Sequence, residues 1–72
     1  MSVARVVEIS AISQSSFEDA IQEGVSRATS TLRGVESAWV KDQNVMLENG
    51  NITGYKVNLE VTFVLDDNQA VS

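Results

Sequence analysis

The chain has 72 residues, of which 43% are hydrophobic, so it forms one domain (1–72) whose core is too small for comfortable stability alone. It contains no cysteine and no histidine, which excludes disulfides, zinc fingers, haem attachment and iron–sulfur clusters. Its net charge of −5 and isoelectric point near 4.3 argue against a nucleic-acid partner, because phosphate contacts need clustered lysine and arginine. Self-association is therefore the favoured way to stabilise so small a domain.

The amino-terminal segment predicts a strand followed by a link. Val3–Ser10 is rich in β-branched residues, and Val3, Val7 and Ile9 share one face. Ala11–Ser15 then forms a polar connection to the next element. This link has neither the glycines nor the lysine of a phosphate-binding loop, so it gives no sign of a nucleotide site.

A long amphipathic helix is predicted over Ser16–Arg33. Its apolar residues recur at the spacing of one helical face: Phe17, Ala20, Ile21, Val25, Ala28 and Leu32. Ser15 followed by Glu18 predicts a capping box, in which each side chain satisfies a free backbone donor of the first turn. Gly34 suits the position just after a helix, and Gly24 indicates a place where a neighbouring backbone comes close.

The second half of the chain predicts a long antiparallel hairpin. Val35–Glu48 has an extended pattern, and Asn49-Gly50 is a strong signal for a type I′ turn. Ile52–Leu65 follows with strict alternation of side chains, and 66–72 form a polar tail. The order is β-α-β-β, so we expect an α+β fold with a three-stranded antiparallel sheet packed on one long helix.

A two-residue turn at Asn49-Gly50 fixes which residues of the hairpin face each other. Val40 then lies opposite Leu59, and Ala38 lies opposite Val61, on the face that the helix covers. The other face is predicted to pair Trp39 with Glu60, Lys41 with Asn58, and Gln43 with Lys56. A β-bulge anywhere in the hairpin would shift this register by one residue.

Two features of the hairpin bear on function. Because the hairpin is longer than the helix, its distal half is expected to project beyond the helix and to pack on other subunits. Trp39 is the only tryptophan and lies on the face away from the helix. Aromatic residues concentrate at interfaces and ligand sites. Three interpretations of Trp39 stay open: a subunit interface, a ligand platform and a plain surface residue, of which the first two can coincide.

The residue types give little support to catalysis. Without histidine or cysteine, the chain lacks the commonest general base and the thiol nucleophile. Lys41 and Lys56 lie near Glu60 on the polar sheet face, but a solvated cross-strand set of charges accounts for them. We therefore expect a protein that is not an enzyme.

The acidic residues offer only a diffuse basis for metal binding. None of them follows the spacing of an EF-hand. The weak candidates for calcium or magnesium are Glu18, Asp19, Asp42 and Glu48. Glu18 and Asp19 are already explained by the positive end of the helix dipole. In a symmetric assembly, however, copies of one carboxylate could meet around an axis and form a site that a single chain lacks.

The sequence predicts neither export nor membrane association. The amino terminus is too short and too charged for a signal peptide. No apolar run approaches the roughly 20 residues of a membrane span, and the helix is not cationic. We expect a cytoplasmic protein with no membrane partner and no nucleic-acid partner.

Several features follow one another in a recognisable order along the chain. They are a first strand with a serine-rich link, Phe17-Glu18 at the helix start, Thr31-Leu32-Arg33 at its end, an E-N-G turn, and a last strand of the form Y-x-V-x-L-x-V-x-F. The runs that carry them are VARVVEISAISQSSFEDAIQEGVSRATSTLRGVESAWVKDQ and ENGNITGYKVNLEVTFVL. Across nearly the whole chain, this set resembles the dodecin family.

The resemblance implies a β-α-β-β subunit that assembles into a hollow, roughly spherical homododecamer. It also implies a non-enzymatic protein that binds, stores or buffers a small ligand. The family's usual ligand is a flavin (riboflavin, FMN or FAD), and pairs of flavin rings stack between tryptophans of two-fold-related subunits. Such an assembly agrees with the independent expectation that this small chain associates with itself.

The positions that hold the flavin in dodecins differ in this chain. The stacking tryptophan aligns with Ser37, while Trp39 stands two residues later, and the glutamine that bonds the flavin ring aligns with Lys56. Two residues along a strand keep a side chain on the same face but move it about 7 Å. The candidate ligand positions are Ser37, Trp39, Gln43 and Lys56.

The same two differences support an alternative function. At both positions the chain is closer to the dodecins that lack the tryptophan and have been described as calcium-binding. The alternative is therefore a dodecin that has lost flavin binding and that binds cations such as calcium or acts as an oligomeric scaffold. A pocket at Ser37, Trp39 and Lys56 wide enough for stacked rings would separate the two functions.

Overall fold

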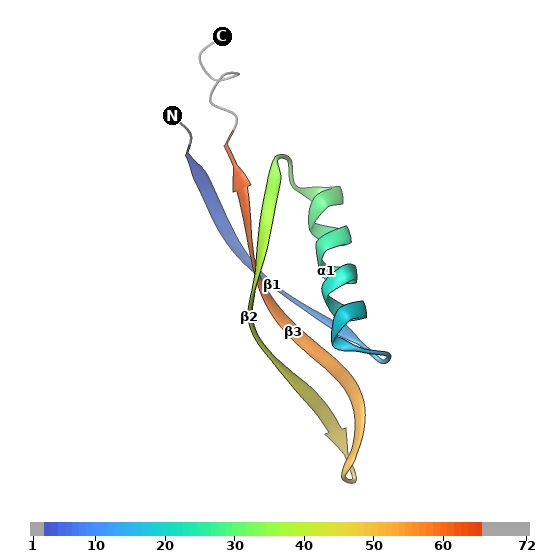
Figure 1. The fold of residues 1–72 in the computed structure, drawn as a ribbon. Helices are drawn as coiled ribbons and strands as arrows, with labels where there is room; N and C mark the ends of the chain where they lie inside the picture. The colour runs from blue at the N-terminus through green and yellow to red at the C-terminus, as the bar shows by residue number, and fades with distance from the viewer. Residues whose placement is uncertain (1–2, 66–72) are drawn as a thin grey trace.

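The computed structural model describes residues 3–65, which form one helix packed on a three-stranded sheet (Figure 1). The elements are β1 (Ala4–Ser13), α1 (Phe17–Thr31), β2 (Val35–Glu48) and β3 (Asn51–Val64). Both strand pairs are antiparallel, and the order in the sheet is β1-β3-β2. The α+β class and the β-α-β-β order predicted from the sequence are confirmed. The predicted polar tail, 66–72, lies outside the described residues.

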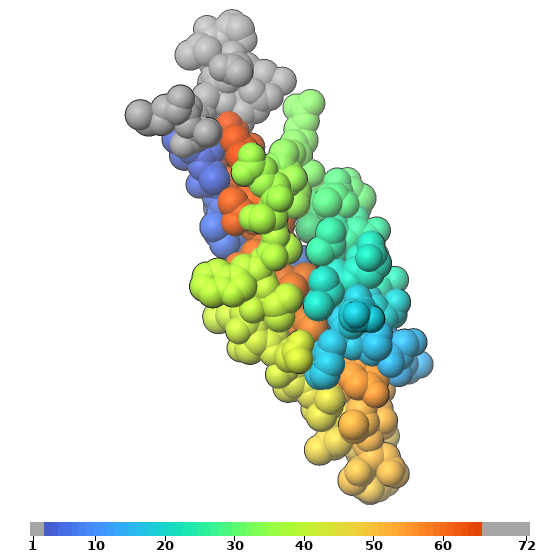
Figure 2. Space-filling view, viewed as in Figure 1, coloured from blue at the N-terminus to red at the C-terminus, as the bar shows by residue number. Residues whose placement is uncertain are grey.

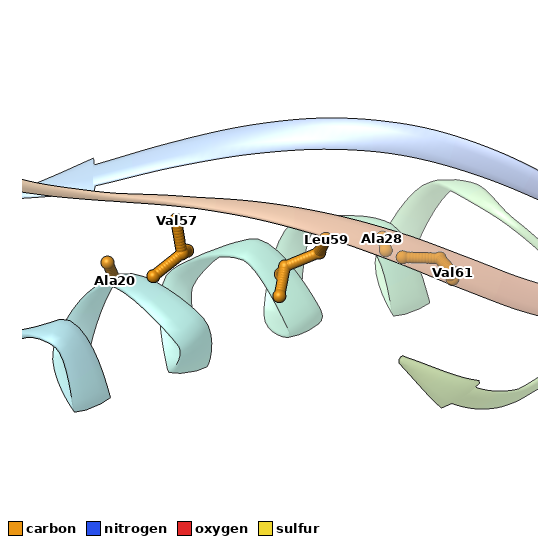
Figure 3. Close-up of a cluster of buried hydrophobic side chains, with 5 residues drawn as sticks. All are labelled: Ala20, Ala28, Val57, Leu59 and Val61. Atoms are coloured by element: carbon orange, nitrogen blue, oxygen red, sulfur yellow. The ribbon is translucent and has the colours of Figure 1, made fainter. Parts of the chain in front are cut away.

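The core is small and lies between α1 and the central strand. Residues on the helix side of β3 alternate with residues on its other side, as the period of a strand requires. The fully or nearly buried hydrophobic residues are Ala20, Ala28, Val57, Leu59 and Val61 (Figure 3). The two that come from the helix are alanines, so α1 lies close against the sheet, and the larger apolar residues Phe17, Ile21, Val25 and Leu32 pack around them, partly buried.

Gly24 lies where α1 packs directly on side chains of the sheet. A Cβ atom there would lie 2.8 Å from Leu59 Cδ1 and 3.3 Å from Ala11 Cβ. Gly24 itself is buried. The sequence predicted close approach of a neighbouring backbone at this glycine, but its neighbours are side chains of β1 and β3.

The helix begins one residue later than the predicted cap. Ser16 is the N-cap, with extended backbone angles, and its side chain accepts a hydrogen bond of 3.0 Å from the Asp19 backbone N–H. The predicted capping box of Ser15 and Glu18 is therefore wrong. The helix starts later because of the buried Ser13. The Oγ atom of Ser13 accepts a hydrogen bond from the Ser15 N–H at 2.9 Å and donates one to Asp19 Oδ2 at 2.7 Å. These bonds hold Ser15 in the turn before the helix.

The helix also ends earlier than the predicted Arg33. The backbone N–H of Leu32 caps the end by donating to the Ala28 carbonyl at 2.8 Å. Gly34 has a φ of +72°, and a Cβ there would lie 2.9 Å from the Val64 carbonyl oxygen, so only glycine fits the turn into β2. With 15 residues in α1, the described part of the chain has no helix that is long and apolar enough to cross a membrane.

The hairpin keeps the predicted register at 37–40 and next to the turn, and loses it in the segment between them. Three predicted pairs are confirmed: Ala38–Val61, Trp39–Glu60 and Val40–Leu59. The register then shifts between Val40 and Asp42, where a β-bulge makes Lys41 an extra residue of β2. Asp42 rather than Lys41 faces Asn58, so the predicted Lys41–Asn58 pair is wrong.

The bulge also changes the face on which Gln43 lies. Gln43 pairs with Val57, a buried residue on the helix side of the sheet, and Asn44 takes the place opposite Lys56. The predicted pairing of Gln43 with Lys56 on the other face is therefore wrong. Because side chains alternate with a period of two, one inserted residue moves every following side chain of β2 to the opposite face.

The distal part of the hairpin extends past the start of α1, as Figures 1 and 2 show. The principal extents are 57 × 18 × 13 Å, and the radius of gyration is 15.1 Å. A compact domain of this length has a radius of gyration of about 11 Å. The projection predicted from the sequence is present, while the packing of this segment on other subunits stays a prediction.

Candidate ligand-binding face

The sheet face away from α1 is covered by no element of the described residues. Its residues alternate with those that pack on the helix, and they form rows across the three strands. From one end to the other the rows are Val6–Thr62–Ser37, Glu8–Glu60–Trp39, Ser10–Asn58–Asp42 and Ile12–Lys56–Asn44. We call these four rows the open face.

Trp39 is the most exposed large apolar residue of the open face. It is 70% exposed and pairs with Glu60 of the central strand. A tryptophan buries on the order of 200 Å² when it is covered, so roughly 3 kcal/mol of burial free energy remains available at this position. The predicted position of Trp39 on the face away from the helix is confirmed. A flat, accessible indole ring on a rigid strand is a surface on which a planar ligand or a second protein chain can pack.

The structure brings together only some of the predicted ligand positions. Ser37 and Trp39 lie in adjacent rows of β2 and on the same face. Lys56 shares that face, but it stands two rows from Trp39, about 13 Å along the strand. Gln43 lies on the helix side of the sheet, so it cannot act together with the other three within one chain.

A polar row that the sequence did not single out lies next to Trp39. Ser10 Oγ donates a 2.5 Å hydrogen bond to Asn58 Oδ1, and Asn58 Nδ2 donates one of 2.5 Å to Asp42 Oδ1. The bulged Lys41 reaches over β3, and its Nζ lies 3.4 Å from Glu8 Oε1. Both of these side chains are about half exposed, so the ion pair contributes little to stability. The polar residues at alternate positions of β1 and β3 were the available signal for this row.

The four predicted metal ligands do not meet in one chain. Glu18 and Asp19 lie in the first turn of α1, Asp42 lies on the open face, and Glu48 ends β2. Asp19 accepts from Ser13 Oγ and Asp42 accepts from Asn58. Among residues 3–65, no three acidic side chains gather closely enough to hold a metal ion. These four acids could therefore share a cation only between copies of the chain.

Comparison with known proteins identifies the family. The model of the dodecin family matches residues 3–66, which is nearly the whole chain. The chain belongs to the dodecin family. This dodecin is 33% identical, over 63 residues, to the calcium dodecin of Mycobacterium tuberculosis, covering 88% of this chain and 89% of that protein. The resemblance inferred from the sequence is confirmed.

Solved dodecin structures share the fold of this dodecin. A mutant of the T. thermophilus dodecin superposes with a TM-score of 0.85 at 33% identity and covers 92% of this chain and 98% of that chain. The Streptomyces coelicolor dodecin gives a TM-score of 0.85 at 28% identity, covering 90% and 93%. The calcium-chelating calcium dodecin of Mycobacterium tuberculosis, described with a novel calcium-binding site, gives 0.78 at 32% identity, covering 89% and 91%. The β-α-β-β subunit of this dodecin is therefore the subunit of its family.

Proposed function

We propose that this dodecin is a non-catalytic protein that assembles from identical copies into a homododecameric shell and binds a flavin against the open face. The observation that carries the proposal is Trp39, which is 70% exposed on a sheet face that no described element covers. Pairing of two open faces would bury this ring and leave a slot between the copies. A flavin ring that stacks in the slot gains about 0.5–1.5 kcal/mol beyond the burial of its area.

The neighbours of Trp39 support a planar ligand that lies towards Ser37. Ser37 is small and exposed in the row beside Trp39, so the sheet surface there has space for a ring. On the other side, the polar row of Ser10, Asn58 and Asp42 offers hydrogen-bonding groups to the ligand's edge. Lys56 lies beyond that row and takes no part in stacking.

Fluorescence titration with riboflavin and FMN tests this function. Flavin emission is expected to be quenched, with saturation near one flavin per chain, and the emission of the only tryptophan should fall in parallel. Trp39→Ala should abolish both signals, whereas Ile12→Ala, at an exposed apolar position in the row of Lys56, should retain flavin quenching. An intact oligomer that quenches no flavin would refute the flavin-binding function.

Cation binding is the second candidate function, and the relation to the calcium dodecin of Mycobacterium tuberculosis supports it. Asp42 on the open face is the most suitable ligand, because pairing of two open faces would bring its copies towards each other. Calcium is then expected to raise the melting temperature of the assembly relative to EDTA, and Asp42→Asn should remove the effect. Glu36→Gln is the matched control, since Glu36 is an exposed acid of β2 at another bulge. Equal melting temperatures in calcium and in EDTA would refute this candidate function.

A further inference from the structure

An apolar groove runs between α1 and β1, on the side of the helix away from β2. Its volume is about 500 Å³, and its apolar lining comprises Val7, Ile9, Ala11, Gly24, Ala28 and Leu32. Glu23 and Arg27 of α1 line it as well. β1 is an edge strand, so no strand of the described sheet closes the groove on that side. The groove is therefore an apolar surface of the subunit that its own sheet and helix leave accessible.

A second accessible apolar surface lies at the far end of the hairpin. The register shifts again between Met46 and Leu47, and this irregularity places Leu47 directly opposite Ile52. The two side chains are 62% and 52% exposed. Bulges re-aim side chains, and here the result is an apolar cross-strand pair next to the turn. We call this pair the hairpin knob.

The hairpin knob cannot fill the groove of its own chain. Phe17, the first residue of α1, packs edge-on against Tyr55, with ring centroids 5.1 Å apart. At this contact α1 stops covering the hairpin. Beyond Tyr55 the hairpin continues away from the helix, as Figure 1 shows, so the knob lies outside the reach of the groove.

We propose that the hairpin knob of one copy docks in the α1–β1 groove of a second copy. The proposal deepens the self-assembly that is part of the proposed function. This docking covers both the hairpin knob and the groove, two apolar surfaces that cannot contact each other within one chain. Charge supports this occupant, because Glu48 follows the knob directly and Arg27 lines the groove. In a chain with a net charge of −5, an attractive pair at the contact offsets repulsion between copies.

The contact is head-to-tail, because the knob and the groove are different surfaces of the same chain. Each copy offers one knob and one groove, so the contact closes as a ring or continues as a filament. In the docked arrangement Glu48 lies towards Arg27 rather than towards Glu23, which stands one helical turn away. The opposite charges of Arg27 and Glu23 along the groove therefore set the direction in which the hairpin of the other copy enters.

Charge reversal tests the proposal in the full chain. Arg27→Glu and Glu48→Arg are each expected to raise, by roughly tenfold, the concentration at which half of the chains are assembled. The double variant should restore assembly, because it reverses the pair. Arg33→Glu is the matched control, since Arg33 is exposed but does not line the groove, and it should assemble like the parent chain.

Cross-linking gives a second and independent readout, because the chain has no cysteine. Copies with Leu47→Cys and copies with Ile9→Cys, carrying different tags, are expected to form a disulfide-linked pair on oxidation, because Ile9 lines the groove. Leu47→Cys with Gln22→Cys, on the exposed side of α1, should form none. An intact oligomer with neither a cross-link nor a charge effect would overturn the docking alone. A small molecule found in the groove by native mass spectrometry would do the same, whereas a monomeric parent chain would overturn the assembly itself.

Discussion

A single methyl group added at Gly24 is expected to destabilise the protein even though it improves the helix. Replacing glycine by alanine inside a helix contributes about 1 kcal/mol of stability. In this structure the new Cβ would lie 2.8 Å from Leu59 Cδ1 and 3.3 Å from Ala11 Cβ. Leu59 is fully buried, so its methyl group must move against neighbouring side chains to make room. Overpacking of this kind costs about 1–3 kcal/mol, which leaves Gly24→Ala destabilising by about 1 kcal/mol.

The sign of that effect is expected to depend on Leu59. Leu59→Val removes the δ carbons, and by itself it should destabilise the chain by about 1 kcal/mol. In the Leu59→Val background the closest contact is gone, so Gly24→Ala should be neutral or stabilising. Urea unfolding of the four proteins, followed by circular dichroism at one fixed chain concentration, gives the coupling free energy. If Gly24→Ala stabilises the parent chain, or if the two effects add within about 0.5 kcal/mol, the close contact is not what requires glycine.

Three further predictions follow from the caps, the turns and the open face. Ser16→Ala should lower the free energy of urea unfolding by about 1 kcal/mol and Ser15→Ala by less than about 0.5, because only Ser16 caps the helix; equal losses would contradict this assignment. Gly34→Ala should lower the melting temperature more than Gly50→Ala, since both have positive φ but only the methyl at 34 meets a carbonyl oxygen of β3, at 2.9 Å. Trp39→Asp should break an assembly that pairs through the open face, so elution of the variant at the parent's oligomeric mass would refute that pairing.

The order of the elements was predictable because the helix and the last strand have clear periods and the turn between β2 and β3 has a clear sequence signal. The apolar residues of α1 recur at helical spacing, and those of β3 alternate strictly. Asn49 and Gly50 both have positive φ, as the type I′ turn predicted from their sequence requires. Local patterns of this kind need no tertiary information, and they were sufficient for the class and the topology.

The exact helix start and the register in the middle of the hairpin were not predictable in this way. Ser15 and Ser16 are equally good caps by residue type, and the choice between them depends on Ser13, whose bonds form only in the folded turn. The bulge at Lys41 lies in β2, where apolar and polar residues alternate weakly. Strict alternation fixes a register, and weak alternation leaves room for an inserted residue.

The candidate site was predictable to the same extent as the register. Trp39 lies opposite Glu60, as counting back from the turn predicts, because the extra residue of β3 at Thr53 and the extra residue of β2 at Lys41 cancel in the count. Gln43 follows the bulge and lies on the opposite face from the one predicted. The row of Ser10, Asn58 and Asp42 joins three strands, and the sequence alone did not predict that β3 lies between the other two.

The position of β3 determines when this chain can fold during its synthesis. Within residues 3–65, β1 and β2 are each paired only with β3, which is synthesised after both of them. Until then a nascent chain holds one helix and two strands without a sheet partner. Pairing Ala4 with Val64 also joins the two ends of the described chain, and contacts so distant in sequence slow folding. A stop codon within the second half of β3 would remove strand pairs from both neighbours at once, so we expect such truncated chains to remain unfolded.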